Sequence, residues 1–264
     1  MTASIPNARD EYVDFCDGVQ GICQIDLSQY KRGQMERRIR SFVERRGRDD
    51  LRGYLDVLRG DKAELDEFLD RVTINVSQLW RNPEQWELLA DKVLPELADR
   101  GRIRAWSAGS SYGAEAFTLA ALCREVVPRA HVQIRGTDID KRMVARAREG
   151  WFSEEDARTA PKAQLERWFE PVDGGWRAKD EVRSIVQFET GDLLQMTPRK
   201  DAFDLVLCRN TVIYFTEPVR DALHARLGAA LRTDGYLLVG STERVSNPRD
   251  IGLEVAFPFT YRKS

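Results

Sequence analysis

Short apolar runs alternate with helical stretches through the part of the chain that follows Gly101. Runs separated by helices are typical of a mostly parallel sheet, because each helix returns the chain to the same end of the sheet and covers one of its faces. The runs are Ile103–Trp106, Val132–Gly136, Ile185–Phe188, Phe203–Cys208 and Tyr236–Val239. The helices expected between them are Ala114–Val126, Lys141–Arg148 and Pro218–Leu231. We therefore predict an α/β domain over residues 100–264.

The residues before Gly101 show a different pattern, in which apolar side chains recur at helical spacing from about Tyr12 to Asp99. Examples are Leu27, Met35, Ile39, Phe42, Val43, Leu65, Phe68, Leu69 and Val72. We predict an all-helical N-terminal domain with a linker over residues 1–99. The alternation also breaks at about 151–180, where prolines and glycines frame short segments, which indicates an inserted subdomain.

The charges of the chain nearly cancel, with 41 basic and 43 acidic side chains and a formal net charge of -2. This balance predicts a folded globule without overall attraction for nucleic acid or anionic membranes. No apolar run approaches the roughly 20 residues of a membrane span, and the N-terminus lacks a signal-peptide pattern. We therefore expect a cytoplasmic protein without membrane insertion. Four cysteines without a CxxC pair, together with only two histidines, predict reduced core thiols and no metal site.

A run of small residues, Ser107–Gly113, joins the first apolar run to the helix at Ala114. Small side chains allow a ligand to approach the backbone closely, and a helix N-terminus offers unpaired N–H groups. Gly109 is therefore a candidate cofactor-binding residue. The run departs from the GxGxxG fingerprint, so a tight strand-to-helix turn without a ligand is an equal alternative.

Acidic residues follow the second and third apolar runs. Asp138 and Asp140 stand where doubly wound folds bind the ribose hydroxyls of a nucleotide, although one of them is equally suited to cap the Lys141 helix. Asp192 could accept a hydrogen bond from an adenine amine, or could simply begin a turn.

Polar and aromatic residues follow the fourth apolar run, which ends at Cys208. Arg209 and Asn210 come first, and Tyr214 and Phe215 come shortly after. The carboxyl edge of an open α/β sheet is where ligands bind, so these side chains are site candidates, with structural capping as the alternative for the Arg–Asn pair.

Taken in order, these residues resemble the chemotaxis-receptor glutamate methyltransferases, the CheR family, which transfer a methyl group from S-adenosyl-L-methionine to receptor carboxylates. The resemblance spans about Tyr12 to Tyr261. Thr73–Arg81 resembles the family segment TTNxTxFFR, and Gly235 with Gly240–Glu243 resembles its closing segment DGxLxxGxxE. Between them, the matching segments are Trp106–Ala108, Gly136–Asp140, Phe203–Asn210 and Ile213–Phe215.

The resemblance implies the fold: a small all-helical N-terminal domain, then a class I S-adenosylmethionine-dependent methyltransferase (Rossmann-like) α/β domain with a small β-subdomain inserted at about 151–180. It also implies that Asn75, Ser77 and Arg81 reach the cofactor from the interdomain segment. The other cofactor-binding residues that it implies are Glu115, Asp138, Asp192, Leu193 and Asn210. The product would be S-adenosyl-L-homocysteine.

The chain departs from the family pattern at two places. Asp192 replaces an expected asparagine, and an acid can still accept from an adenine amine. Where the family has STGEEPYS, Ser111–Thr118 lacks the first acid and the proline and places Tyr112 in the loop. Tyr112 and Ala114 favour an alternative, a non-catalytic S-adenosylmethionine-binding signalling module of the same fold.

A glutamate carboxylate has an ordinary pKa of about 4.3, so this substrate is a nucleophile at neutral pH without a general base. The enzyme must instead place the carboxylate in line with the methyl group. We expect Arg81 to orient the carboxylate and Tyr214 to shape the methyl-transfer pocket, and packing against the sheet edge is the alternative role for Tyr214.

The N-terminal helix carries many basic residues against few acids, namely Lys31, Arg32, Arg37, Arg38, Arg40, Arg45, Arg46 and Arg48. A solvated helix face would explain them, but the resemblance supplies an acidic receptor helix as a partner. We expect a monomer that binds a methyl-accepting chemotaxis receptor through this helix.

Two further interpretations concern recognition. Glu170–Arg177 is shorter than the hairpin with Gly-x-Gly that pentapeptide-tethered relatives carry, so we predict recognition independent of a receptor's C-terminal pentapeptide. A nucleic-acid methyltransferase is the less favoured alternative, because the net charge is slightly negative and an NPPY-type or paired-cysteine motif is missing.

Overall fold

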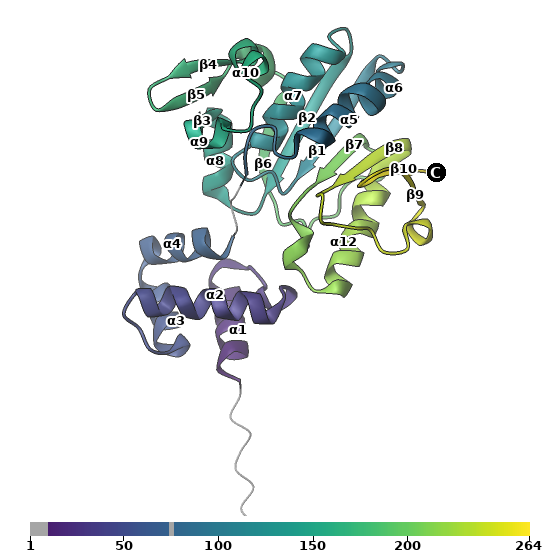
Figure 1. Ribbon diagram of the computed structural model, residues 1–264. Coiled ribbons are helices and arrows are strands. Elements are labelled where there is room, and N and C mark those ends of the chain that lie inside the picture. The colour runs from purple at the N-terminus through teal and green to yellow at the C-terminus, as the bar shows by residue number, and fades with distance from the viewer. Residues whose placement is uncertain (1–9, 74–76) are drawn as a thin grey trace, which may run out of the picture. The chain divides into compact units, whose positions relative to one another are not determined.

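A computed structural model describes residues 10–73 and 77–264, and its contacts divide the chain into two compact units (Figure 1). One unit comprises residues up to 74 together with Tyr214–Glu217, and the other comprises residues 75–213 and Pro218–Ser264. The predicted helical domain with its linker ran to residue 99, and residues 77–99 belong to the second unit.

The first unit is helical, as the apolar spacing predicted. Its elements are α1 (Glu11–Cys23), the 3-10 turn η1 (Leu27–Gln29), α2 (Arg32–Arg45), α3 (Leu51–Gly60) and α4 (Lys62–Val72). An aspartate precedes several of these helices and accepts a hydrogen bond from the first turn, as Asp61 does from Ala63 N at 2.9 Å. Such caps satisfy N–H groups that would otherwise lack a partner.

An aromatic cluster forms the core of this unit, where Phe15 lies 5.8 Å from Phe68 and both rings lie near Tyr54. The segment Tyr214–Glu217 is joined to the helices by backbone hydrogen bonds. Lys31 N donates to Tyr214 O at 2.8 Å, and Thr216 N donates to Gln29 O at 3.0 Å. Tyr214 is therefore held by the helical unit.

The second unit begins with a helix in three parts: α5 (Pro83–Leu88), a π-helical turn η2 (Leu89–Val93) and α6 (Leu94–Ala98). Pro95 has no N–H to continue the α-helical ladder, and the wider turn ends with Leu94 N bonded to Leu89 O. Such single π turns accommodate a local break in the ladder. Within residues 10–73 and 77–264, no helix combines the length and the apolar character needed to cross a membrane.

The main sheet has seven strands in the order β6-β2-β1-β7-β8-β10-β9. The strands are β1 (Arg102–Ala108), β2 (His131–Asp138), β6 (Val186–Thr190), β7 (Phe203–Cys208), β8 (Leu231–Val239), β9 (Leu253–Phe257) and β10 (Thr260–Lys263). β6, β2, β1, β7 and β8 pair in parallel, and β10 is antiparallel to β8 and β9. The predicted, mostly parallel α/β fold is confirmed.

The three predicted helices are present between these strands as α7 (Ala114–Val126), α8 (Lys141–Glu149) and α12 (Glu217–Ala230). Two 3-10 turns that were not predicted, η3 (Val212–Tyr214) and η4 (Pro248–Ile251), also lie between strands. The last predicted helix ended at Leu231, whereas Leu231 already begins β8 and pairs with Phe203. A register shift then leaves Tyr236 opposite Leu205, so the chain enters the sheet before the apolar run that marked the strand.

The insertion between α8 and β6 forms a separate three-stranded sheet, β3-β5-β4 (Figure 1). Its elements are β3 (Trp151–Ser153), α9 (Glu154–Ala157), α10 (Lys162–Trp168), β4 (Phe169–Val172), β5 (Gly175–Ala178) and α11 (Asp180–Arg183). Gly175 allows β5 to approach β3, because a Cβ there would lie 2.0 Å from Phe152 O. The predicted β-subdomain at 151–180 is therefore present.

Burial of the thiols agrees with their predicted core positions at three of four sites. Cys16, Cys123 and Cys208 are buried, whereas Cys23 is partly exposed near the end of α1.

Candidate functional site

The strand order reverses between β1 and β7, so the loops after these strands diverge at the carboxyl edge of the sheet. Open α/β sheets bind ligands at such a switch point. Most predicted site residues lie in the second unit, near or just beyond the ends of its strands: Gly109, Glu115, Asp138, Asp192, Leu193 and Asn210. Ser77 and Arg81 precede α5 in the same unit. Asn75 lies outside the described residues, and Tyr214 belongs to the first unit.

Gly109 is required by the turn itself. Its φ is +82°, and a Cβ at this position would lie 2.5 Å from Thr211 Oγ1 in the loop after β7. Gly109 N and Ser110 N both donate to Thr137 O, at 2.9 and 3.0 Å, which closes the loop onto the end of β2. Glycine is thus needed for backbone conformation and for loop packing.

Asp138 and Asp140 divide the two roles that the sequence left open. Asp140 caps α8, accepting from Arg142 N at 2.9 Å. Asp138 is buried and accepts from Ser111 N at 2.7 Å and from Asp140 N at 3.0 Å. Burial raises the pKa of Asp138, and the two N–H groups oppose that shift. The capping role of Asp140 leaves Asp138 as the acid at the end of β2.

Asp192 begins the turn after β6. Its Oδ1 accepts from Leu194 N at 2.8 Å, and its carbonyl accepts from Met196 N at 2.8 Å. Among the described residues Oδ2 has no hydrogen-bond partner, so it retains lone pairs for an incoming donor. Leu193 beside it is buried.

A buried ion pair joins the loops after β1 and β7. Glu115, in the first turn of α7, accepts from Ser107 Oγ at 2.7 Å and from Arg209 Nη1 at 3.4 Å. Burial raises the pKa of Glu115, and the Arg209 guanidinium opposes that shift. Glu115 and Arg209 are only 8% and 7% exposed. Either charge would therefore be strongly destabilised in this buried position without the other.

The same guanidinium also holds the segment 77–82. Arg209 Nη2 donates to Arg81 O at 2.6 Å, and Nε donates to Gln85 Oε1 at 2.9 Å. Trp86 Nε1 donates to the same Arg81 carbonyl at 2.9 Å. The backbone of Arg81 is therefore fixed while its side chain remains half-buried.

Sequence reasoning assigned no role to Gln85 or Ser107, although both are buried polar residues of this network. Gln85 lies in an otherwise ordinary helix start, and its partners Arg209 and Val239 are far away in the chain. The polar pair Arg209–Asn210 after an apolar strand was the one usable signal.

Glu243 fixes the turn that carries Asn210. Its Oε2 accepts from Asn210 N at 2.9 Å and from Gly240 N at 2.6 Å, and its Oε1 accepts from Val212 N at 3.1 Å. Asn210 has a φ of +57°, a conformation that asparagine tolerates better than most residues. A Cβ on Gly240 would lie 2.6 Å from Glu243 Oε2, which explains the glycine.

Tyr112, which the sequence placed in the glycine-rich loop, is buried in the second unit at 3% exposure. Its ring packs against Phe152, and the guanidinium of Arg146 lies 3.9 Å from the ring centroid. The tyrosine is therefore part of the packed interior beside the inserted subdomain.

These groups suit an adenosine-containing cofactor. Asp138 offers a carboxylate at the position that binds ribose hydroxyls in doubly wound folds, and Asp192 Oδ2 can accept from an amine. Ser110 Oγ is a buried hydroxyl in the loop before α7 and has no partner among the described residues. A buried hydroxyl of this kind is a ready contact for a bound ligand.

Comparison with known proteins defines the family. Residues 10–73 match the family described as "CheR methyltransferase, all-alpha domain", and residues 75–255 match "CheR methyltransferase, SAM binding domain". The chain is 32% identical to a chemotaxis protein methyltransferase of Listeria innocua over 262 residues, covering 98% of this chain and 100% of the relative. It is 31% identical to chemotaxis protein methyltransferase 1 of Vibrio cholerae, covering 95% and 94% of the two chains. The chain therefore belongs to the CheR methyltransferase family, whose cofactor is S-adenosyl-L-methionine.

Proposed function

We propose that this protein transfers the methyl group of S-adenosyl-L-methionine to glutamate side chains of chemotaxis receptors. The observation that carries the proposal is the ordered match of both family domains, over residues 10–73 and 75–255. Relatives named chemotaxis protein methyltransferases align over almost the whole chain, so the helical unit is shared as well as the cofactor domain.

The chemistry of a carboxylate acceptor agrees with the residues present. The chain has only two histidines. His131 lies exposed at the start of β2, the end of the strand opposite the candidate site, and His224 is buried within α12. An acceptor with an ordinary pKa of about 4.3 is already ionised and requires placement rather than a base.

Arg81 and Tyr214 are the proposed catalytic residues. Arg81 would orient the carboxylate, and the bonds from Arg209 and Trp86 to its carbonyl support this role because they fix the backbone from which its side chain extends. Tyr214 would shape the methyl-transfer pocket. Arg81→Ala should lower the transfer rate about 100-fold, the loss that misplacement of reacting groups can cause. The exposed Arg102→Ala is the matched control, and normal transfer by a folded Arg81→Ala protein would refute the assignment.

The direct test uses a receptor cytoplasmic fragment and S-adenosylmethionine with a labelled methyl group. We expect label on the receptor that dilute base releases as methanol, because carboxyl methyl esters hydrolyse in base. Replacing the labelled glutamates of the receptor by aspartate or alanine should abolish incorporation. Label that resists base, or that appears on nucleic acid, would contradict a glutamate acceptor.

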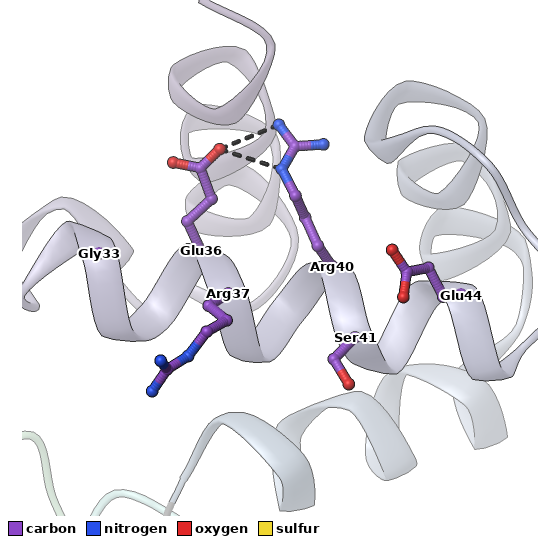
Figure 2. A pocket seen from close by; sticks show the side chains of 6 residues that line it. All are labelled: Gly33, Glu36, Arg37, Arg40, Ser41 and Glu44. Carbon is purple, nitrogen blue, oxygen red and sulfur yellow. Dashed lines mark hydrogen bonds and ion pairs between the residues drawn. The ribbon is translucent and has the colours of Figure 1, made fainter.

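The proposed partner surface is α2 of the helical unit, but its neighbours neutralise part of the basic charge. Arg32 pairs with Asp10 and Glu36, Arg40 pairs with Glu11 and Glu36, and Arg46 pairs with Glu64 and Glu67. By contrast, Arg37 makes no ion pair with any described residue and points away from the Glu36–Arg40 pair (Figure 2). An open hollow on this face is lined by Gly33, Glu36, Arg37, Arg40, Ser41 and Glu44. Arg37 is therefore a cation of α2 that is available to an acidic receptor helix.

Binding of a receptor fragment should weaken as salt rises from 0.1 to 1 M, because the screening length falls from about 10 Å to about 3 Å. Arg37→Glu should weaken binding more than Arg59→Glu, which alters an exposed arginine of α3 already paired with Asp56. If the two variants weakened binding equally, α2 would not be part of the docking surface.

Recognition independent of a receptor's C-terminal pentapeptide is also proposed. β4 and β5 are joined by the short turn at Asp173 and Gly174, which supports the proposal because a longer hairpin loop is missing between these strands. Calorimetry with a free receptor pentapeptide should show no heat of binding at micromolar concentrations, and micromolar affinity would overturn this part.

A further inference from the structure

The hydroxyl of Tyr112 links two segments that are distant in sequence. It lies within hydrogen-bond distance of Asp156 Oδ1, at 2.8 Å, and also contacts the carbonyl of Ser77. A phenol has one proton, so the two acceptors share one donor. Burial, followed by the hydrogen bond and charge of Asp156, raises the pKa of Tyr112, so the hydroxyl keeps its proton at neutral pH.

Asp156 is itself held firmly in place. Its Oδ2 accepts from Ser153 N at 2.9 Å, which completes the N-terminal cap of α9, and also pairs with Arg146 of α8. Arg146 in turn covers the face of the Tyr112 ring. The tyrosine hydroxyl is thus anchored on a rigid acceptor in the inserted subdomain.

The segment that begins at Ser77 is tied to the rest of its unit at several further points. Leu79 N donates to Asp156 O at 2.9 Å, and Thr159 Oγ1 donates to Leu79 O at 2.6 Å. Trp80 N donates to Thr118 Oγ1 of α7 at 3.1 Å. The contact with Tyr112 lies at the Ser77 end of this segment, and Arg209 holds the other end at Arg81.

We propose that Tyr112 is a positioning residue for the cofactor, holding the 77–82 segment through the Ser77 carbonyl so that Ser77 and Arg81 meet S-adenosylmethionine in a fixed geometry. The inference rests on the proposed roles of Ser77 and Arg81. Tyr112, which in the sequence favoured a non-catalytic module, would in this arrangement support the cofactor site.

Tyr112→Phe tests the proposal, because it keeps the ring packing against Phe152 and Arg146 and removes only the hydroxyl. Calorimetry should show the Kd for S-adenosylhomocysteine rising about tenfold, which corresponds to about 1.4 kcal/mol. The KM for S-adenosylmethionine should rise in parallel. At saturating cofactor kcat should stay within about twofold, because Arg209 and Trp86 still hold the Arg81 carbonyl. Amide exchange across residues 77–82, measured without cofactor, should become faster.

Tyr236→Phe is the matched control. Its hydroxyl also donates to a carboxylate, Glu96 Oε2 at 2.7 Å, from a buried ring of the same unit, and Glu96 lies in α6. This control should lose stability without changing the Kd for S-adenosylhomocysteine.

A Tyr112→Phe protein with cofactor affinity within twofold of the parent and unchanged exchange would overturn the proposal, as would a parent that binds no S-adenosylhomocysteine. The Kd and the amide exchange are measured without a receptor, and only the KM and kcat need one. Failure to methylate receptor glutamates would therefore refute the proposed function and leave the inference about Tyr112 standing.

Discussion

Removing the Arg209 guanidinium should destabilise the second unit severely. The side chain is 7% exposed and donates to Gln85 Oε1, Glu115 Oε2 and the Arg81 carbonyl, at 2.9, 3.4 and 2.6 Å. Its guanidinium also lies 4.9 Å from the centre of the Trp86 ring. Arg209→Met would fill similar space but leave the Glu115 carboxylate buried without its cation.

The expected magnitude follows from that burial. Breaking a buried ion pair by removing one partner costs about 3–5 kcal/mol, because the remaining charge has lost both its partner and its water. With a urea dependence of about 2 kcal/mol per M, the unfolding midpoint should fall by about 2 M. Adding Glu115→Gln to Arg209→Met should recover part of the loss, since a neutral amide is less costly to bury.

Tryptophan fluorescence is a suitable assay, because all six tryptophans of the chain lie at or after residue 80, within the second unit. Arg262→Met is the matched control. Arg262 also contacts two acids, Glu96 at 2.9 Å and Asp234 at 3.0 Å, and lies over the ring of Tyr236, but its side chain is 43% exposed. Its loss should cost under about 1 kcal/mol.

A midpoint for Arg209→Met that matches the Arg262→Met midpoint would refute the reasoning, because burial is the property that separates the two arginines. Arg209→Lys guards against a variant that does not fold. It keeps the charge, loses the planar fork, and should fall between the parent and Arg209→Met.

Three further predictions address other parts of the second unit. Burial lowers the pKa of His224 to about 4 from 6.5, so between these pH values the unfolded chain binds more protons than the folded chain. The free energy of unfolding should therefore fall by roughly 3 kcal/mol as the pH drops from 6.5 to 4. In urea unfolding at different pH values, His224→Leu should lose this dependence and His131→Gln should keep it. Gly175→Ala should disrupt the β3–β5 pairing and its amide protection far more than Gly174→Ala. At Gly174 the nearest contact of the Cβ would be at 3.9 Å, and alanine bears only the cost of a φ of +72°, about 1–2 kcal/mol. Glu243→Gln should lower the unfolding midpoint and weaken S-adenosylhomocysteine binding in calorimetry, because an amide nitrogen would face backbone N–H groups that the carboxylate now accepts.

The sequence alone determined the five parallel strands of the α/β domain and the three main helices between them, but not the antiparallel strands β9 and β10. Helix Ala114–Val126 has the predicted bounds, since its apolar residues and the preceding glycines are local signals. Ordered motifs also indicated the family and its cofactor, because a binding loop is formed by consecutive residues of the sequence. The candidate acids Asp138 and Asp192 were found in this way, each directly after or near the end of a strand.

Tertiary structure decided which charges and polar groups meet. Arg209 bonds to Gln85 and Glu115, which are far from it in the sequence. Residue spacing cannot predict such hydrogen bonds. The basic residues of α2 looked unopposed in sequence, yet acids from other segments of the helical unit pair with several of them. In the sequence, Tyr112 was a bulky residue in the cofactor loop, and only the structure shows that its hydroxyl bonds to Asp156. Local patterns specify elements because backbone geometry is periodic, whereas hydrogen bonds and burial depend on residues that only folding brings together.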